Sequence, residues 1–360
     1  MASHVPASGR LGGIVRYTVE LARALAERDD VELHLLTSAG AADHLAPLAG
    51  SAGRVHALPA AVDRVLPAYE RWVLAATLGD RFDVVHGVKH LVPRGARARA
   101  LLTVHDMILA DRPQDFPLAK RTLLQRPYAA SIRQADVLVC VSAATRDALV
   151  RHHPSVADRA AVVLSATSPQ LLSAAPAPVS ALEGRRFGLV VGDTSKRKNV
   201  ATAVTAWARM VAAHPEHSDA VLALVGPPAW GEEAYGPDHA RLVASGHLVQ
   251  LQGIDDAALR WCYENSAVVL APSLVEGYGL PAKEAIDLGA PLVTSTDPAL
   301  VEVSGSAAQH VDALDVDGWA DAVTAHLVAG AERPQPSAHP RSWAEVADET
   351  VRAVLSRPHR

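Results

Sequence analysis

Two carboxylates, Glu276 and Glu284, stand eight positions apart around the predicted start of a helix. The apolar run at 267–271 predicts a buried strand, and the turn at 277–279, Gly-Tyr-Gly, follows Glu276. Pro281 then takes the favoured first position of a helix. A helix N-terminus offers unpaired amides and partial positive charge to an anion such as a diphosphate. Ionised acids beside it accept hydrogen bonds from hydroxyls, so the segment predicts a nucleotide-sugar site.

Five segments, this one included, follow one another in an order that resembles the retaining glycosyltransferases of family 4. The acids Glu276 and Glu284 match the E-x7-E signature of that family. The other four segments are Gly12-Gly13-Ile14-Val15-Arg16-Tyr17-Thr18, Leu102-Thr103-Val104-His105-Asp106, Val141-Ser142-Ala143-Ala144-Thr145, and Val191-Gly192 through Arg197-Lys198-Asn199. Each string is common by itself, but five in order over nearly the whole chain indicate the family. The resemblance implies the two-domain GT-B fold.

The basic segment of this pattern is a candidate clamp for the leaving group. In transfer from a nucleotide sugar, negative charge develops on the diphosphate, and preorganised cations stabilise it. The resemblance gives this role to Lys198, with Arg197 beside it; in isolation the segment 196–198 would instead be a solvated loop. Asp193 departs from relatives, which place Arg or Thr there, and a carboxylate facing a diphosphate would repel it. We expect Asp193 either to turn away or to cap the following turn.

The resemblance also implies roles for residues of the N-terminal half. Gly12 and Gly13 are predicted to present backbone amides to the distal phosphate and the acceptor side, which is compatible with a tight turn that opens a helix. His105 is predicted to lie against the donor sugar near its reacting carbon, through its side chain or its backbone carbonyl. A lone histidine at the end of a strand is otherwise usually structural.

The two acids are expected to bind different hydroxyls. Glu284 is predicted to accept hydrogen bonds from the ribose, and Glu276 from the hexose. A nucleophilic role for Glu276 is the alternative, but the family resemblance favours same-face displacement, in which the departing phosphate helps to deprotonate the acceptor. The predicted catalytic residues are His105, Lys198 and Glu276, and the predicted donor-binding residues are Gly12, Gly13, Arg197, Gly277, Tyr278, Gly279, Leu280 and Glu284.

Strands and helices alternate along the chain, which predicts an α/β protein with two doubly wound parallel sheets. The expected strands are 31–37, 82–86, 100–105, 137–142 and 161–165, then 187–191, 221–225, 248–251, 267–270 and 291–294. The predicted organisation is an acceptor-side domain at 1–166, a linker rich in Pro, Ala and Ser at 167–183, a nucleotide-sugar domain at 184–332, and a Pro-rich break with a terminal helix at 333–360. The resemblance implies that this helix packs back on the N-terminal domain.

The N-terminus departs from the family pattern. Relatives begin with an apolar strand that leads into the Gly-Gly turn, whereas this chain opens Met1-Ala2-Ser3-His4. The first strand, normally central in the sheet, is therefore expected to be missing, and a start codon assigned too late would explain it. Two neighbouring strands would then lose their ladder partner, and the N-terminal domain would be less stable.

Charge is divided unevenly between the halves. Through residue 165 there are 20 Lys and Arg against 16 Asp and Glu, a balance of +4, and the remainder has 14 against 23, a balance of −9. The basic half is compatible with a weak peripheral contact with anionic lipid or with a lipid-diphosphate acceptor, although ordinary solvated surface is the simpler interpretation. So small a balance argues against nucleic acid as a partner.

Other compositional features favour a cytoplasmic protein without a cofactor or metal. The two cysteines, Cys140 and Cys262, suggest neither a disulfide framework nor a metal site. Asp315-Val316-Asp317 spells the motif of metal-dependent transferases, but it precedes a predicted helix and is expected to cap it. We find no long apolar run or signal pattern, so the expected location is the cytoplasm or the inner membrane face.

Taken together, the sequence predicts a retaining, metal-independent glycosyltransferase. The donor would be a nucleotide-diphosphate sugar, with a mannose-like hexose and GDP favoured because the Gly-Gly and Val-His-Asp segments resemble mannose-transferring relatives. The acceptor would be a glycan, a lipid-linked sugar or a small molecule, reached when the two domains close. The rival hypothesis is a non-catalytic nucleotide-sugar-binding relative or a disabled fragment, which Asp193 and the missing strand favour.

Overall fold

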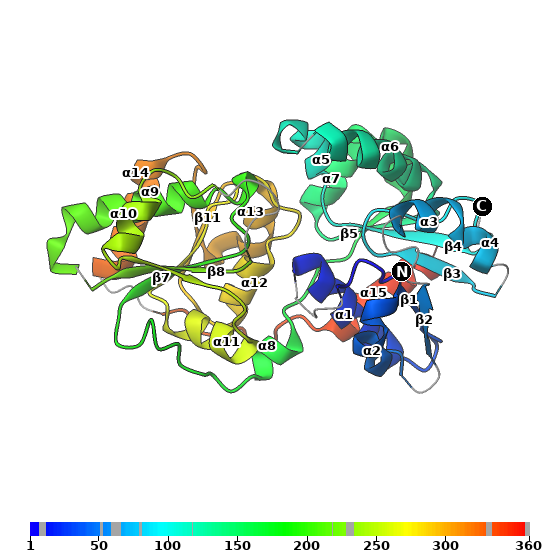
Figure 1. Ribbon diagram of the computed structural model, residues 1–360, viewed down its shortest axis with the longest axis horizontal. Coiled ribbons are helices and arrows are strands. Elements are labelled where there is room, and N and C mark those ends of the chain that lie inside the picture. The colour runs from blue at the N-terminus through cyan, green and yellow to red at the C-terminus, as the bar shows by residue number, and fades with distance from the viewer. Residues whose placement is uncertain are drawn as a thin grey trace. The chain divides into compact units, whose positions relative to one another are not determined.

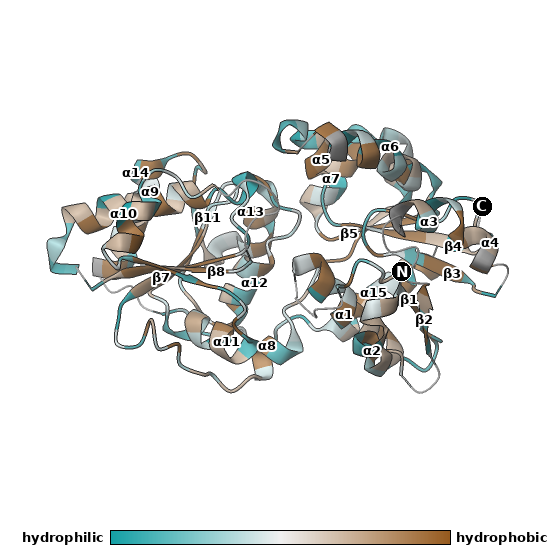
Figure 2. Cartoon of the chain, in the orientation of Figure 1, coloured by the Kyte–Doolittle hydropathy of each residue, from teal (hydrophilic) through white to brown (hydrophobic). Residues whose placement is uncertain are grey.

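The computed structural model describes residues 1–6, 12–50, 53–58, 66–78, 81–116, 118–217, 219–227, 234–328 and 333–356. The chain forms two compact units, each with its own core. Unit 1 comprises Met1–Ala166 and Arg341–Arg360, and unit 2 comprises Thr167–Pro340. Figure 1 shows parallel strands with helices around them in both units, and Figure 2 shows that the strands of both are mostly apolar.

Unit 1 contains two parallel sheets. The first pairs β1 (His34–Ser38) with β2 (Arg54–Leu58), and the second has the order β3-β4-β5-β6. Its strands are β3 (Val84–Gly87), β4 (Arg99–Val104), β5 (Val137–Cys140) and β6 (Ala160–Val162). Strands β4 and β5 are buried along their whole length, as expected for the centre of a parallel sheet covered on both faces.

The expected gap between two neighbouring strands is present in the described part of unit 1, where β1 and β3 belong to separate sheets. Met1 and Ala2 lie between them. The amide of Ala2 donates to the Leu36 carbonyl of β1 at 2.7 Å, and the amino group of Met1 donates to the His86 carbonyl of β3 at 2.7 Å. Among the described residues, one backbone hydrogen bond on each side therefore stands where a strand would make a full ladder.

The helices of unit 1 surround these sheets. They are α1 (Gly13–Ala26), α2 (Ala42–Leu45), α3 (Leu66–Trp72), α4 (Leu74–Leu78), α5 (Ile108–Asp111), α6 (Leu118–Gln134), α7 (Ala143–His152) and the terminal α15 (Trp343–Leu355). A capping box between Ser342 and Glu345 begins α15. Its Trp343 packs edge-on against Tyr17 of α1, with ring centroids 5.3 Å apart, so the last helix of the chain belongs to the fold of unit 1.

Unit 2 is built on one six-stranded parallel sheet. Its strands are β7 (Phe187–Val191), β8 (Val221–Val225), β9 (Leu248–Leu251), β10 (Val268–Ala271), β11 (Leu292–Ser295) and β12 (Gln309–Val311), in the order β12-β11-β10-β7-β8-β9. The chain runs outward from β7 to β9, then returns to the other side of β7. The order therefore reverses between β7 and β10, and ligands bind beyond the carboxyl ends of the strands at such a point.

Helices cover both faces of this sheet (Figure 1). Those on one face are α9 (Val200–Ala213), α10 (His239–Ala244) and α14 (Val316–Val328), and those on the other are α8 (Pro169–Ser173), α11 (Asp256–Asn265), α12 (Leu280–Asp287) and α13 (Pro298–Ser304). Trp207 of α9 and Trp319 of α14 are completely buried in the first core. Asp315 accepts from the Gly318 amide at 3.0 Å, so it caps α14 as expected.

The prediction of a separate linker at 167–183 is wrong. This segment belongs to unit 2 and contains α8, and both Leu171 and Leu182 are fully buried in the unit 2 core. Residues 333–340 also belong to unit 2. A composition rich in Pro, Ala and Ser indicates irregular backbone, but irregular backbone can still carry leucines that pack.

Candidate donor site

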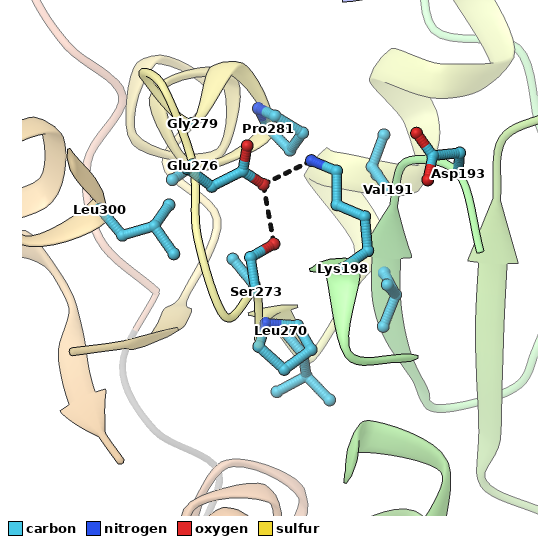
Figure 3. A pocket seen from close by; sticks show the side chains of 13 residues that line it. Val191, Asp193, Lys198, Leu270, Ser273, Glu276, Gly279, Pro281 and Leu300 are labelled. Carbon is cyan, nitrogen blue, oxygen red and sulfur yellow. Dashed lines mark hydrogen bonds and ion pairs between the residues drawn. The ribbon is translucent and has the colours of Figure 1, made fainter. Parts of the chain in front are cut away.

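The candidate site lies in unit 2 where three neighbouring strands end. The loops after β7, β10 and β11 meet there, at the reversal of the strand order. They line a small pocket that includes Asp193, Lys198, Ser273, Glu276, Gly279, Pro281 and Leu300 (Figure 3). The prediction from sequence and the topology of the sheet therefore indicate the same place.

The loop after β7 positions the cations. Gly192 has a φ of 142°, and a Cβ there would lie 3.4 Å from Cε of Lys198, so the lysine stem lies close over the glycine backbone. The short helix Lys196–Lys198 follows, and Asn199, with a φ of 53°, leads into α9. The Asn199 side chain donates to the carbonyls of Pro272 and Ala313 at 3.0 and 2.6 Å. These bonds fix the basic loop to the loops that follow β10 and β12.

The loop after β10 positions the first acid. Ser273 donates its hydroxyl to Glu276 at 2.7 Å, and the Leu274 amide donates to the Arg197 carbonyl at 2.8 Å, so the acidic and basic loops are joined. Gly279 caps α12 with a φ of 93°, and a Cβ on it would lie 2.6 Å from a methyl carbon of Leu300. A glycine is therefore required at the turn that aims the helix N-terminus at the pocket.

Glu276 forms ion pairs with two cations of the basic loop. Its carboxylate accepts from Lys198 Nζ at 2.5 Å and from Arg197 at 3.4 Å, and its side chain is only 10 % exposed. Arg197 reaches Asp193 at 3.2 Å on its other side. Burial acts to raise the pKa of Glu276, but Lys198 and Arg197 outweigh it and hold that pKa below its ordinary value. The two cations and two carboxylates of this group balance in charge.

Asp193 does what one of the two sequence hypotheses expected of it. Its carboxylate accepts from the Ser195 amide at 3.0 Å, which caps the turn, and it pairs with Arg197. Burial acts to raise the pKa of Asp193, yet Arg197 and the bond from Ser195 lower it overall. The carboxylate is thus held by a turn and a guanidinium of its own loop.

The second acid lies one turn into α12. Glu284 is 5 % exposed and accepts a hydrogen bond from the Tyr263 hydroxyl of α11 at 2.7 Å. Tyr263 is fully buried, so its ring and hydroxyl fix the direction of the carboxylate. Gly277 and Tyr278 are buried in the turn before α12, and Leu280 is the first residue of that helix.

A third carboxylate, Asp297, stands at the start of α13. It accepts from the amides of Ala299 and Leu300 at 3.0 and 3.3 Å. Burial, with the Glu276 carboxylate nearby, raises the pKa of Asp297 to about 6. The ionised form of the Asp297 carboxyl is therefore disfavoured.

His105, Gly12 and Gly13 lie in unit 1. Gly12 and Gly13 begin α1 and are exposed. His105 is half-buried, with Nε2 2.8 Å from the Val88 carbonyl and its ring edge-on to Tyr17 at 4.8 Å. Burial lowers the pKa of His105 to about 4, so the ring is neutral at pH 7, and Nε2 carries the proton that it donates to Val88.

Comparison with known proteins assigns both halves of the chain. Residues 11–170 match the family described as Glycosyltransferase Family 4, and residues 185–328 match Glycosyl transferases group 1. The chain is 27% identical over 359 residues to O-antigen chain mannosyltransferase B of Escherichia coli, covering 94% of this chain and 90% of that protein. It is 29% identical over 275 residues to MMP alpha-(1->4)-mannosyltransferase of Mycolicibacterium hassiacum, covering 68% and 61%.

The chain is a family 4 glycosyltransferase. Its fold agrees with this. Sucrose-phosphate synthase from Thermosynechococcus elongatus superposes with a TM-score of 0.65 at 19% identity, covering 96% of this chain and 89% of that one. WaaG, a glycosyltransferase involved in lipopolysaccharide biosynthesis, gives 0.64 at 14% identity, covering 96% and 92%. The predicted fold class, GT-B with two Rossmann-like units, is confirmed.

Within unit 2 of the glycosyltransferase, the structure brings together four of the eight residues predicted from the sequence. Lys198 and Arg197 contact Glu276 directly, and Gly279 lines the same pocket as Lys198 and Glu276. The other four lie in the adjoining turn and in α12, outside the lining of that pocket: Gly277, Tyr278, Leu280 and Glu284. The functional roles of all eight, and those of Gly12, Gly13 and His105 in unit 1, stay predictions.

Sequence reasoning missed four residues of this enzyme's site. Ser273, three positions before Glu276, carried a local signal, because a hydroxyl at that spacing reaches the acid in a turn. Asn199 carried another, since asparagine tolerates positive φ better than most residues. Tyr263 and Asp297 gave none, because their contacts depend on how α11 and α13 pack against α12.

No group of three or more His, Cys, Asp or Glu side chains is placed to hold a metal ion within the described ranges. None of the helices in the part of the chain that the structure describes is both long enough and apolar enough to cross a bilayer.

Proposed function

We propose that this glycosyltransferase moves a hexose, with mannose favoured, from a nucleotide-diphosphate sugar to a glycan, lipid-linked or small-molecule acceptor. The reaction retains the anomeric configuration and uses no metal ion. The observation that carries the proposal is the contact of Lys198 and Arg197 with Glu276, at the reversal of strand order and beside the N-terminus of α12.

The charge balance of the site supports an exchange of partners. A diphosphate would compete with Glu276 for Lys198 and Arg197, because phosphate oxygens accept charge-assisted hydrogen bonds as a carboxylate does. Glu276, released from Lys198, would then accept from a sugar hydroxyl. The same cations would stabilise the charge that grows on the diphosphate as the glycosidic bond breaks.

The remaining residues have distinct tasks in this proposal. Glu284, held by Tyr263, would accept from the ribose hydroxyls. The amides at the start of α12 would face the phosphates. His105 is neutral and its Nε2–H is engaged by Val88, so its ring would offer Nδ1 as an acceptor rather than act as a cation.

Mannose is favoured because both curated relatives are named as mannosyltransferases. GDP-mannose is the donor we propose, and polysaccharide or glycolipid assembly the context. A cytoplasmic location, with peripheral contact between unit 1 and an anionic membrane, is part of the same proposal.

Thermal unfolding with UDP, GDP, ADP and TDP, each in millimolar excess, tests the donor. A nucleotide that binds only the folded state at about 100 times its dissociation constant adds about 2.7 kcal/mol, so we expect a clear rise in the midpoint with GDP. Transfer from the matching sugar nucleotide should then persist in EDTA. A cooperative transition that no nucleotide shifts would instead support the non-catalytic rival.

A further inference from the structure

A second concentration of positive charge lies in unit 1, far along the chain from the donor loops. It is an open hollow of about 540 Å³ between the end of α3 and one side of α6. Arg71 and Trp72 form one wall, and the other consists of Gln125, Arg126, Pro127, Ala129, Ala130 and Arg133. We call this surface, together with Arg94 over the Trp72 ring and the exposed Leu118 and Leu123 of α6, the basic face.

The apolar side chains of the basic face stand in solvent. Trp72 is 57% exposed, Leu118 70% and Leu123 71%. Positions 118, 126, 129 and 133 share one side of α6 by helical spacing, and Tyr128 and Ile132 on the other side are buried in the unit 1 core. The exposed leucine and arginines therefore occupy the side that the fold leaves open, and Figure 2 shows α6 carrying both apolar and polar stretches.

The cations of the basic face are not paired with acids in the part of the chain that the structure describes. Among the described residues, none of Arg71, Arg94, Arg126 and Arg133 forms an ion pair with an acid. Arg71 is fixed by bonds to the Val92 carbonyl and the Gln134 side chain at 2.8 and 2.7 Å. The guanidinium of Arg94 lies 5.0 Å from the Trp72 ring centroid and that of Arg71 lies 5.6 Å away.

This combination fits one class of partner better than others. A small soluble anion would use the guanidinium groups but would gain nothing from protruding leucines. Nucleic acid would require a larger excess of charge than the N-terminal half carries. A bilayer with anionic headgroups uses both: phosphates accept from arginines, indole rings favour the interface, and leucines bury in the acyl boundary.

We propose that the basic face docks the enzyme on the surface of an anionic phospholipid bilayer. This inference rests on one part of the proposed function, the peripheral contact between unit 1 and an anionic membrane. It assigns that contact to α3, Arg94 and α6. The docked protein lies on the membrane without crossing it.

Co-sedimentation with vesicles tests the proposal on the full chain. The wild type should bind vesicles of phosphatidylcholine mixed with phosphatidylglycerol, bind pure phosphatidylcholine weakly, and dissociate as salt rises. The double change Arg126→Gln and Arg133→Gln should weaken partitioning about 25-fold, since each basic residue near the surface contributes about fivefold. Its matched control, Arg209→Gln with Arg241→Gln in unit 2, removes the same charge and should bind as the wild type.

A second pair of variants tests the apolar part. Leu118→Ser with Leu123→Ser should lower partitioning about fivefold. Leu314→Ser with Leu355→Ser, at side chains 70% and 72% exposed elsewhere, should not. The proposal would be overturned if the wild type failed to bind anionic vesicles, or bound neutral vesicles equally well. It would also be overturned if the basic-face variants bound anionic vesicles as strongly as the wild type. The nucleotide-induced rise in unfolding midpoint should be unchanged in all variants, so failure of docking and failure of the donor proposal remain distinguishable.

Discussion

The two cationic regions of the enzyme differ in what accompanies the charge. In unit 2, Lys198 and Arg197 are paired with Glu276 and Asp193 in a partly buried pocket. In unit 1, Arg94, Arg126 and Arg133 stand beside an indole and exposed leucines, with no paired acid among the described residues. Buried cations need counter-charges to offset desolvation, whereas surface cations remain hydrated.

The difference indicates that the two regions bind anions in different ways. At the donor site a ligand must displace carboxylates, so affinity depends on geometry and on the charge already present. At the basic face nothing is displaced, so attraction should be long-ranged, additive and sensitive to salt. Changes in the donor cluster should therefore have large and specific effects, and changes on the basic face graded ones.

The largest effect should follow Lys198→Ala. Removing a preorganised cation from a developing negative charge typically costs about 10²–10³-fold in turnover. Single-turnover assays with saturating donor would measure it. Lys196→Ala, an exposed neighbour in the same short helix, is the matched control, and we expect it to change turnover less than about twofold. Near-normal turnover of Lys198→Ala would mean that other residues stabilise the leaving group. It would also contradict the expectation that changes at the donor site have larger effects than changes on the basic face.

Glu284→Ala should come next in size. Loss of a buried charged acceptor costs about 1.5–3 kcal/mol, so nucleotide affinity should fall about 10- to 100-fold, measured by calorimetric titration. Tyr263→Phe, which removes the bond that orients this acid, should weaken affinity about fivefold and leave turnover at saturating donor close to that of the wild type. Unchanged nucleotide affinity in Glu284→Ala would refute the ribose role.

The sequence was sufficient for the fold and for the charged centre of the site. Apolar runs located β7 and β8 to the residue, because buried parallel strands are continuous apolar segments. The bounds of β9, a partly buried strand at the edge of the sheet, were also predicted correctly. The spacing of Glu276 and Glu284, with glycines between, marked the loop. Strand β2 was not predicted from the sequence because its side chains are mostly not buried. Strand β12 was not predicted because it has only three residues.

What the sequence left out depends on packing between segments. Tyr263 meets Glu284, and Asp297 stands near Glu276, only because α11, α12 and α13 cover one face of the sheet. The segment 167–183 was wrongly predicted as a linker for the same reason: Leu171 and Leu182 find their partners far along the chain.

The next prediction concerns Asp297 and the free energy of unfolding, not activity. Its pKa in the folded protein is about 6 against an ordinary value of 3.8, so the folded state binds more protons and stability falls as pH rises from about 4 to about 6. Asp297→Asn can keep the caps on Ala299 and Leu300 while removing the charge. It should raise the free energy of unfolding at pH 7 by roughly 1 kcal/mol. Denaturant titrations at pH 4 and pH 7 would measure it, and a variant with the wild-type pH dependence would contradict the assignment.

The smallest effect we expect is that of Asp193→Asn, and its sign tests whether charge or geometry dominates the donor cluster. Asparagine can still accept from the Ser195 amide, so the turn should persist while the cluster gains one unit of positive charge. If charge dominates, donor affinity should rise about threefold, by the order of a screened, partly exposed pair, and the gain should fade as salt increases. A tenfold loss would mean instead that Asp193 holds Arg197 in place, so that even in this cluster a carboxylate opposed to the diphosphate contributes more by position than it costs by repulsion.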